Sequence, residues 1–570
     1  MLSRVHDTIF IVSVVVSSQL VEAWSIVDHG WIRVTPSQSA RRGERWVLTD
    51  ESGREMLFRG VNINVISYRL AGDDRPMDSF AYMPGRCPPN RPLQYKNPPL
   101  CGMEAGSGKY NQSTMPAAGN DLAQIRALGF NLVRLGISWS LLEPQPGSFS
   151  EEYLRRIEQV VKWAAEQDIW VLIDFHQDFY SYSLDNGSKI GSYVDGAPPW
   201  AVLNASISSF PLWEQWLFGK VGFDWQTVAA FRAFYNNERP VGSPMGIQEH
   251  YIRAVASVVA RFRENRSVLG FELMNEPAPS ELDVFAFSDK LLYPFYKRIV
   301  QAVTGINDGM VQCPMQAAVG DSCAFPDLGI HDTRHLIFFE PMALRNQLDF
   351  SVQTSRPWTN YTNIVFSPHT YTYSFTLDID GFTPITGYAE SLDSAWREAT
   401  AMRSSVLVTE FGSAPDHLER SGNISLQQDL HLTSSTFWVW KEGHGGWGLW
   451  IGASGEAGFR LNGDRVRQLS RARPLAVAGR LLSLRYVPAL AGRNSSLNLS
   501  VETNNVTTPT LVYVPAHLHT PNISVFGAAW LVRVTLAPDG SHTVTVASEP
   551  SVGQLYFIAI SAGERSFLHQ

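Results

Sequence analysis

The amino-acid sequence predicts an α/β protein, a (β/α)8 TIM barrel followed by a C-terminal all-β sandwich. The chain has 570 residues, of which 44% are hydrophobic and 18% charged, which is enough apolar material for more than one buried core. Eight short apolar runs recur before residue 450, with helical patterns between them, and repeated strand and helix units are typical of the barrel. After Arg473 the pattern changes to short alternating runs between turns, which indicates a sandwich.

Each predicted barrel strand is a short apolar run that ends in polar residues or in a Gly or Pro signal. Helices between the runs are predicted from apolar residues at i, i+3 and i+4 spacing, most distinctly over residues 121–128 and 151–168. The eight predicted strands span residues 56–64, 131–139, 169–178, 269–277, 336–341, 363–371, 405–412 and 435–441.

The predicted domain division follows this change of pattern. Residues 24–472 are expected to form the catalytic barrel and residues 473–570 the C-terminal sandwich. Within the second domain, alternation of apolar and polar residues predicts strands of a half-buried sheet. These strands are expected at residues 482–487, 497–501, 510–514, 523–526, 530–536, 543–546 and 554–560.

The N-terminus has the pattern of a secretory signal peptide, which we assign to residues 1–23. An apolar run from Ile9 to Leu20 follows Arg4, and small residues precede a cleavage site after Ala23. The run is shorter than the roughly 20 residues that a membrane span needs. An uncleaved anchor is the alternative interpretation. The expected location is extracellular or a lysosome-like compartment.

Glycosylation and disulfide bonds are expected in a secreted chain. Asn-X-Ser/Thr sequons, acceptors for N-glycans in secreted proteins, begin at Asn111, Asn186, Asn204, Asn265, Asn360, Asn423, Asn494, Asn498, Asn505 and Asn522. The four cysteines form two close pairs in sequence, and we predict disulfides between Cys87 and Cys101 and between Cys313 and Cys323. Three pairings are formally open.

Composition excludes one large class of function and favours another. The net charge of -8 provides no basic surface for nucleic acid. The chain contains 17 Trp, 19 Tyr and 30 Phe, and exposed aromatic rings suit sugar rings and lipid chains. Sugars and lipids are therefore the favoured partners, a glycolipid at a membrane or micelle surface among them, and neither a cofactor nor a protein partner is implied.

Two glutamates at predicted strand ends suggest the chemistry. Glu276 ends the fourth strand in Asn-Glu-Pro and Glu410 ends the seventh in Glu-Phe-Gly. Barrel active sites form at the carboxyl ends of the strands, so both glutamates are expected to face one cleft. Retaining glycoside hydrolysis requires such a pair, one protonated and one ionised, with about 5 Å between the carboxyl groups. The prediction is that Glu410 is the nucleophile and Glu276 the acid/base.

Neighbouring strand ends supply residues suited to hold a sugar. Arg134 and Tyr371 are expected beside the nucleophile, where a cation and a hydroxyl favour its ionised form. The predicted sugar contacts come from Asn275, His176, Asp178 and His369, with Trp440 as an aromatic floor.

Several of these residues have a structural interpretation as well. Asp178 suits the cap of the following helix, His176 suits a hydrogen-bonded core histidine, and Trp438 suits barrel filling. For Glu340, at the end of the fifth strand, a structural role is favoured over catalysis. No metal site is expected, because the histidines and carboxylates lack ligand spacing.

With these residues identified, the chain resembles glycoside hydrolase family 5 and, within it, the endoglycoceramidase-like enzymes that cleave glycosylceramides. Asn275-Glu276-Pro277 and Glu410-Phe411-Gly412 are similar to motifs of the whole clan. The ceramidase-like branch is indicated by His176-Gln177-Asp178, by Gly196-Ala197-Pro198-Pro199-Trp200 and by Ala476-Val477-Ala478-Gly479.

The resemblance implies the same catalytic pair, a sugar subsite shaped by the residues named above, Trp200 at the substrate and a C-terminal sandwich. The chain departs from the family at Ser67-Tyr68-Arg69, where a lysine contacts the sugar in relatives, and in the Cys87 to Cys101 insertion. The aromatic-rich segment 197–235, with Trp213 and Trp216, suggests a lid or groove for lipid chains, or else an amphipathic helix packed on the barrel.

The sequence therefore predicts a secreted retaining β-glycosidase that cleaves a glycan, or a single hexose, from a ceramide-like lipid. The alternatives are a steryl or other β-glucosidase, an endo-β-glucanase of the same fold, and a non-catalytic glycolipid-binding protein. The last alternative has no need for both glutamates.

Overall fold

The computed structural model describes most of the barrel and nearly all of the sandwich. The described residues are 30–66, 121–184, 196–210, 219, 222–280, 284–308, 326–351, 358, 360–373, 386–413, 417–440, 447–451, 460–489 and 493–564. The predicted signal peptide, all four cysteines and the tryptophans at 213 and 216 lie outside these ranges, so the predictions for them stay predictions.

The predicted (β/α)8 TIM barrel is confirmed. Parallel strands are hydrogen-bonded in the order β10-β11-β12-β4-β5-β6-β7-β8-β9, and an additional pairing of β9 with β11 closes the sheet. The sixth predicted strand is divided into two because Pro368, which lacks an N–H, interrupts the ladder. The barrel strands are β4 (Arg59–Ile66), β5 (Leu132–Ile137), β6 (Trp170–Phe175), β7 (Val268–Glu272), β8 (Leu336–Phe339), β9 (Ile364–Phe366), β10 (His369–Thr370), β11 (Ser405–Phe411) and β12 (Ser434–Phe437).

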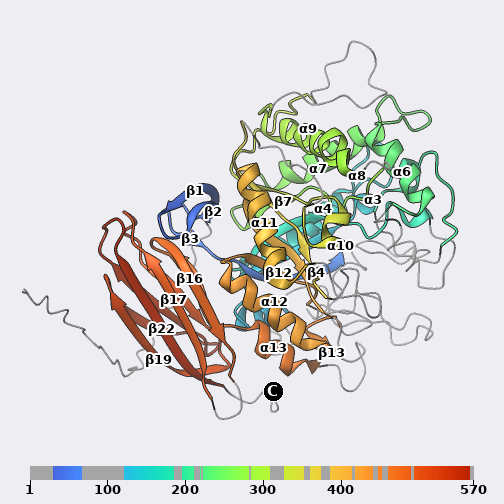
Figure 1. Ribbon diagram of the computed structural model, residues 1–570. Helices are drawn as coiled ribbons and strands as arrows, with labels where there is room; N and C mark the ends of the chain where they lie inside the picture. The colour runs from blue at the N-terminus through green and yellow to red at the C-terminus, as the bar shows by residue number, and fades with distance from the viewer. Residues whose placement is uncertain are drawn as a thin grey trace, which may run out of the picture.

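Amphipathic helices cover the outside of the barrel (Figure 1). In α4 the Ser150 side chain caps the helix by accepting a hydrogen bond from the Tyr153 N–H, and Leu154, Ile157 and Val161 are buried. Within the described ranges, no helix combines the length and the apolar composition that crossing a bilayer requires. The helices are α2 (Asp121–Ala127), α3 (Trp139–Leu142), α4 (Glu151–Ala165), α6 (Trp225–Tyr235), α7 (Ile247–Phe262), α8 (Val284–Phe287), α9 (Tyr293–Thr304), α10 (Ala343–Leu348), α11 (Tyr388–Met402), α12 (Leu418–Leu430) and α13 (Gly463–Leu469).

The C-terminal domain is a two-sheet sandwich, as expected, but it also contains the first strands of the chain. Its four-stranded sheet has the order β16-β17-β22-β19, and its seven-stranded sheet has the order β1-β2-β3-β15-β18-β21-β20. Alternating apolar residues from both sheets form a core of their own. The strands are β1 (Arg33–Ser39), β2 (Gly43–Thr49), β3 (Glu55–Met56), β15 (Arg473–Val477), β16 (Arg480–Val487), β17 (Ser495–Glu502), β18 (Thr510–Val514), β19 (Leu518–Gly527), β20 (Ala529–Leu536), β21 (His542–Ser548) and β22 (Leu555–Glu564).

The predicted domain boundary at residue 473 is therefore incomplete. Strand β3 pairs with β15, with Met56 opposite Ala476, and Figure 1 shows the blue strands β1 to β3 beside the orange strands of the C-terminal domain. Long-range pairing of this kind leaves no local sequence signal. Residues 33–56 belong to the sandwich sheet although they precede the barrel.

Buried arginines join the sandwich to the barrel. Arg473, at the start of β15, donates to the carbonyl of Leu57, the carbonyl of Gly129 and the side-chain oxygen of Asn131. Arg473 is 3% exposed, so these acceptors have lost their access to water and depend on it. Arg473 therefore links the sandwich to the barrel at the end opposite the carboxyl ends of the barrel strands.

Candidate active site

The acid/base candidate, Glu276, lies just beyond the carboxyl end of β7. Its neighbour Asn275 donates from the backbone N–H to the Phe175 carbonyl of β6, and the side chains of Asn275 and Gln177 each donate to the other's backbone carbonyl. The backbone of Glu276 adopts a left-handed conformation with φ 40°, which is uncommon for a residue with a side chain. The local turn places the carboxyl group at the mouth of the barrel.

The nucleophile candidate, Glu410, comes from β11 and lies next to β10. His369 and Glu410 are direct partners in the parallel pairing of these strands. The Tyr371 hydroxyl donates to Oε2 of Glu410 over 2.8 Å, and Arg134 Nη1 donates to Oε1 over 2.7 Å. Both carboxylate oxygens thus accept hydrogen bonds, the arrangement that an ionised nucleophile requires.

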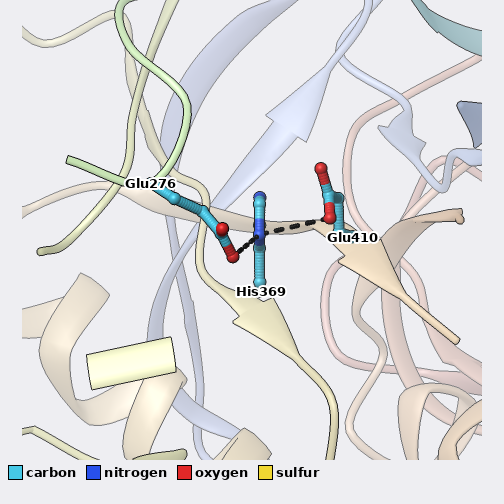
Figure 2. A group of neighbouring side chains, drawn as sticks. All are labelled: Glu276, His369 and Glu410. Carbon is cyan, nitrogen blue, oxygen red and sulfur yellow. Dashed lines mark hydrogen bonds and ion pairs between the residues drawn. The ribbon is translucent and has the colours of Figure 1, made fainter. Parts of the chain in front are cut away.

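The two glutamates face each other across His369. Figure 2 shows their carboxyl groups on either side of the imidazole ring. One oxygen of Glu276, Nδ1 of His369 and one oxygen of Glu410 all lie within 4.8 Å of one another. A gap of about 5 Å between carboxyl groups suits direct attack and retention, whereas about 6.5–9.5 Å would leave room for the water of an inverting reaction. The geometry is that of a retaining pair.

Arg134 is the centre of the charge network beneath this pair. The guanidinium is fully buried and, besides Glu410, it contacts Glu272, Glu340 and Asp174. Burial would lower the pKa of Arg134, but these four carboxylates outweigh it and raise the pKa well above its usual value. A permanent positive charge is therefore held directly below the nucleophile.

His369 carries a second positive charge between the two glutamates. Its Nδ1 lies 2.8 Å from Glu276 Oε1 and 3.4 Å from Glu410 Oε2, and its Nε2 lies 3.1 Å from Glu340 Oε1. Burial alone would lower the pKa of His369, but the carboxylates of Glu340 and Glu410 raise it well above the usual range.

The same three side chains, Glu276, His369 and Glu410, have the composition of a three-ligand metal site. A metal ion would need the imidazole without its proton, whereas the surrounding carboxylates favour the protonated ring. The structure therefore favours a proton over a metal ion between these side chains.

His176 occupies the edge of the site together with Trp438. Its Nδ1 lies 2.7 Å from Asp174 Oδ2, and its Nε2 lies 3.9 Å from Oδ1 of the half-buried Asp178. Burial opposes protonation, but Asp174 and Asp178 raise the pKa of His176 to about 9. The Trp438 ring stacks on His176, with 5.3 Å between ring centroids and 11° between planes.

Two predicted site residues are placed differently from the expectation. Trp440 was expected to form an aromatic floor, but it is 1% exposed and packs edge-on against Trp450 in the barrel core. The partly exposed ring at the site belongs to Trp438. The reason is that β12 ends at Phe437, so the strand alternation that predicted the faces does not continue to these tryptophans.

Trp200 was expected at the substrate because of its motif. Its indole N–H donates to the Glu143 carbonyl over 3.2 Å, and its ring packs edge-on against Trp139 and His250. These contacts place Trp200 in the packing between α3 and α7.

Sequence reasoning also missed several members of the network. Asn62 of β4 accepts from Arg134 Nη1 over 3.0 Å and donates to the Thr409 carbonyl. Asp174 and Glu272 were not assigned a role. All three lie on barrel strands and contact Arg134. In the sequence, each is a charged or amide residue within an otherwise apolar strand, and this pattern could have indicated them.

Comparisons with known proteins agree with this geometry. The chain matches the model of the cellulase family, glycosyl hydrolase family 5, over residues 94–443. It is similar to endoglycoceramidase I of Rhodococcus hoagii (strain 103S), with 26% identity over 446 residues that cover 74% of this chain and 76% of that protein. A shorter match to endoglycoceramidase of Cyanea nozakii has 28% identity over 214 residues, 33% of this chain and 40% of that protein.

Among solved structures, the chain resembles endo-glycoceramidase II from Rhodococcus sp. in its ganglioside GM3 complex. The TM-score is 0.65 at 22% sequence identity, over 93% of this chain and 100% of that chain, and this likeness shows a shared fold. The family model, by contrast, spans more than half of the chain and covers the strand ends that carry Glu276 and Glu410. The chain therefore belongs to glycosyl hydrolase family 5.

Proposed function

We propose that the protein is a secreted retaining β-glycosidase that hydrolyses the bond between a glycan, or a single hexose, and a ceramide-like lipid. Glu410 attacks the anomeric carbon while Glu276 gives its proton to the oxygen of the departing primary alcohol. The glycosyl-enzyme ester is then hydrolysed by a water molecule that Glu276 deprotonates, which restores both side chains. The gap between Glu276 and Glu410, bridged by His369, is the observation that carries the proposal.

The lipid half of the proposal is supported by the relatives named as endoglycoceramidases and by an apolar rim next to Gly222, which lies close to Pro279. The rim consists of Ile207, Phe223 and Trp225, which are 61%, 67% and 61% exposed. A hydrogen bond from the Ser206 N–H to the Gln226 side chain brings these segments together.

The apolar rim adjoins the turn that carries the acid/base. A Cβ atom at Gly222, next to Phe223, would lie 3.4 Å from Pro279, which is three residues beyond Glu276. Further along, Phe231 and Phe234 of α6 are buried. Among the described residues of the segment, α6 thus packs on the barrel, while Phe223 and Trp225 at the start of this helix are exposed.

Secretion is supported by the position of the glycosylation sequons. In the described part of the chain, Asn265 is partly buried and the other sequon asparagines are exposed, namely Asn204, Asn360, Asn423, Asn494, Asn498, Asn505 and Asn522. Exposure is the condition that an N-glycan needs. Digestion of the secreted protein with an amidase that removes N-glycans, followed by intact-mass measurement, tests this, and an unchanged mass contradicts it.

The central experiment compares aglycones. Purified protein is incubated with monohexosylceramide, a ganglioside, a steryl glucoside and a soluble β-glucan, and the products are identified by mass spectrometry, with Glu410→Gln as the inactive control. Release of intact glycan and free ceramide is expected. Cleavage of the steryl glucoside alone indicates the steryl glucosidase alternative, and cleavage of soluble β-glucan alone indicates an endo-glucanase. Binding of the glycolipid without hydrolysis indicates a non-catalytic glycolipid-binding protein.

A second experiment tests the apolar rim. The double variant Phe223→Ser with Trp225→Ser is expected to lose hydrolysis of ceramide glycosides in lipid vesicles, while hydrolysis of a soluble aryl glycoside stays at the wild-type rate. Val241→Ser is the control, because Val241 is also an exposed apolar residue but lies outside the apolar rim. Equal loss on both substrates contradicts a role in lipid recognition.

A further inference from the structure

Glu340 is a buried carboxyl group that the proposed reaction does not use directly. It follows the last residue of β8 and is 0% exposed. One of its oxygens, Oε2, accepts from the backbone N–H of Glu276 over 3.1 Å and from Nδ2 of Asn346 over 3.4 Å. The other, Oε1, lies 3.1 Å from Nε2 of His369 and 3.3 Å from Nη2 of Arg134. Glu340 therefore contacts both the backbone of the acid/base and the ring that touches its carboxyl group.

The contact with the backbone matters because Glu276 has an unfavourable conformation. A non-glycine residue at φ 40° is strained, and this conformation persists only where surrounding structure holds it. The Glu340 carboxyl group holds the one backbone donor of Glu276 in this turn. Loss of that acceptor would remove a hydrogen bond that holds the turn, and relaxation of the turn would move the carboxyl group away from the leaving oxygen.

The contact with His369 decides where protons lie around Glu276. Nε2 of His369 faces Glu340 and Nδ1 faces Oε1 of Glu276, so the ring is held from both sides. With Glu340 in place the imidazole keeps both protons, and Nδ1–H donates to Glu276 Oε1. The proton for the leaving group then remains on Oε2 of Glu276. A neutral ring with a bare Nδ1 would instead accept that proton and hold it away from the substrate.

We propose that Glu340 is a positioning residue for the acid/base step, whose two oxygens hold the Glu276 turn and the His369 ring in the arrangement that presents the proton of Glu276 to the leaving oxygen. Glu340 touches neither the substrate nor the reacting atoms. This role rests on the proposed function only as far as Glu276 serves as general acid, and it is independent of the lipid. It extends the structural role expected for Glu340 from the sequence.

The test separates acid catalysis from folding by the leaving group. Two β-glycosides of the same sugar are compared, a dinitrophenyl glycoside, whose leaving group departs without a proton, and an alkyl glycoside, whose leaving group needs one. The quantity measured is kcat/KM, because it reports the glycosylation step. Glu340→Ala is expected to lose about 10²-fold on the alkyl glycoside, the lower end of what a general acid contributes, and less than tenfold on the dinitrophenyl glycoside.

Two further variants keep the result interpretable. Glu340→Gln retains an acceptor for the Glu276 N–H but replaces the carboxyl group that faces Nε2 of His369 with an amide, and it is expected to show a smaller change in the same direction; it also serves if the alanine variant does not fold. Glu143→Gln is the matched control, since Glu143 is equally buried but contacts Trp139 and His250. The control is expected to lower the melting temperature without changing the ratio of the two substrates.

The outcomes distinguish this proposal from the proposed function. An equal loss on both glycosides by Glu340→Ala and Glu340→Gln, or no loss on either, overturns the positioning role of Glu340. A wild-type protein that cleaves neither glycoside contradicts the glycosidase function itself. A wild-type protein that cleaves both glycosides but no glycosylceramide contradicts only the lipid specificity.

Discussion

Tyr371 donates its hydroxyl hydrogen to Oε2 of Glu410 over 2.8 Å, while Arg134 holds the other oxygen of the same carboxylate. The phenol is buried, and burial together with Glu410 raises the pKa of Tyr371 well above its usual value, so the hydroxyl stays a donor across the physiological range. The orientation of the nucleophile is thus set by two donors from different strands.

Removing one of these donors should slow the reaction without unfolding the protein. We expect Tyr371→Phe to lower kcat/KM by about 10- to 100-fold, since a hydrogen bond to a charged group contributes roughly 1.5–3 kcal/mol. Tyr361→Phe is the matched control, because Tyr361 is also buried and donates to the His335 carbonyl far from the glutamates. Steady-state kinetics check the pair, and equal effects of the two variants would contradict the role of Tyr371.

The two glutamates should respond differently to substitution. Glu410→Gln is expected to lose hydrolysis of every glycoside, because no nucleophile remains. Glu276→Gln should lose about 10²- to 10⁴-fold on substrates that need a proton and form the glycosyl-enzyme normally from activated aryl glycosides. Intact-mass measurement of the trapped intermediate distinguishes the two variants. A Glu410→Gln protein as fast as wild type would exclude this chemistry.

Asp349 makes stability depend on pH. It lies at the end of α10, fully buried, and accepts from the Thr372 hydroxyl. Burial raises the pKa of Asp349 to about 7, although hydrogen bonding by Thr372 and the charge of Arg345 oppose this. In the unfolded chain the pKa is about 3.9. Between about pH 4 and 7 Asp349 therefore binds more protons in the folded state than in the unfolded state, so its contribution to the free energy of unfolding falls as pH rises.

Asp349→Asn should remove this dependence. We expect the free energy of unfolding of the variant, measured by chemical denaturation at several pH values between about 4 and 7, to fall less steeply than that of the wild type. Asp539→Asn, at an exposed position, is the control and should follow the wild-type curve. Parallel curves for wild type and Asp349→Asn would show that Asp349 titrates normally.

Arg473 should be essential for stability rather than for catalysis. Arg473→Met would leave the carbonyls of Leu57 and Gly129 without their donor, at about 1–3 kcal/mol for each unsatisfied group, while Asn131 would keep its hydrogen bond from the Arg59 N–H. Arg485→Met, at an exposed position on β16, is the control. Thermal unfolding measures the difference, and a variant with the wild-type melting temperature would contradict this interface.

Removal of metal ions should leave the activity unchanged. Glu276, His369 and Glu410 are close enough to bind an ion, but the carboxylates around His369 favour its protonated form. Activity after dialysis against a strong chelator, compared with activity after addition of Zn²⁺ or Mg²⁺, checks this. Loss on chelation with recovery on addition of one ion would reverse the assignment.

Most of the barrel and the reacting residues were predictable from the sequence. Barrel strands are buried on both sides and read as short apolar runs, and the polar residues that end them lie at one face of the fold. From this rule alone, the sequence predicted that Glu276, His369 and Glu410 lie close together. Their hydrogen-bonding partners required the structure, because the contacts of Arg134 with Glu272 and Glu340 depend on side-chain direction across the barrel.

Other features were hidden by their range or by irregular backbone. The pairing of Met56 with Ala476 joins opposite ends of the chain, and periodicity reports only local structure. The sequence predicted Trp440 at the site, but Trp438 lies there. The prediction failed because β12 ends at Phe437, so the alternation of a strand no longer decides which side chain faces the site. The division of the sixth strand at Pro368 was visible in the sequence as a residue that cannot donate to a ladder.

The pairing of β3 with β15 has a consequence for biosynthesis. The ribosome releases the first three strands at the start of translation, but the strand that completes their sheet emerges only after the whole barrel. Until then the nascent polypeptide exposes an unpaired edge that can associate with other chains. A premature stop codon just before codon 473 would thus leave every barrel strand in a chain whose strand β3 has lost its β15 partner.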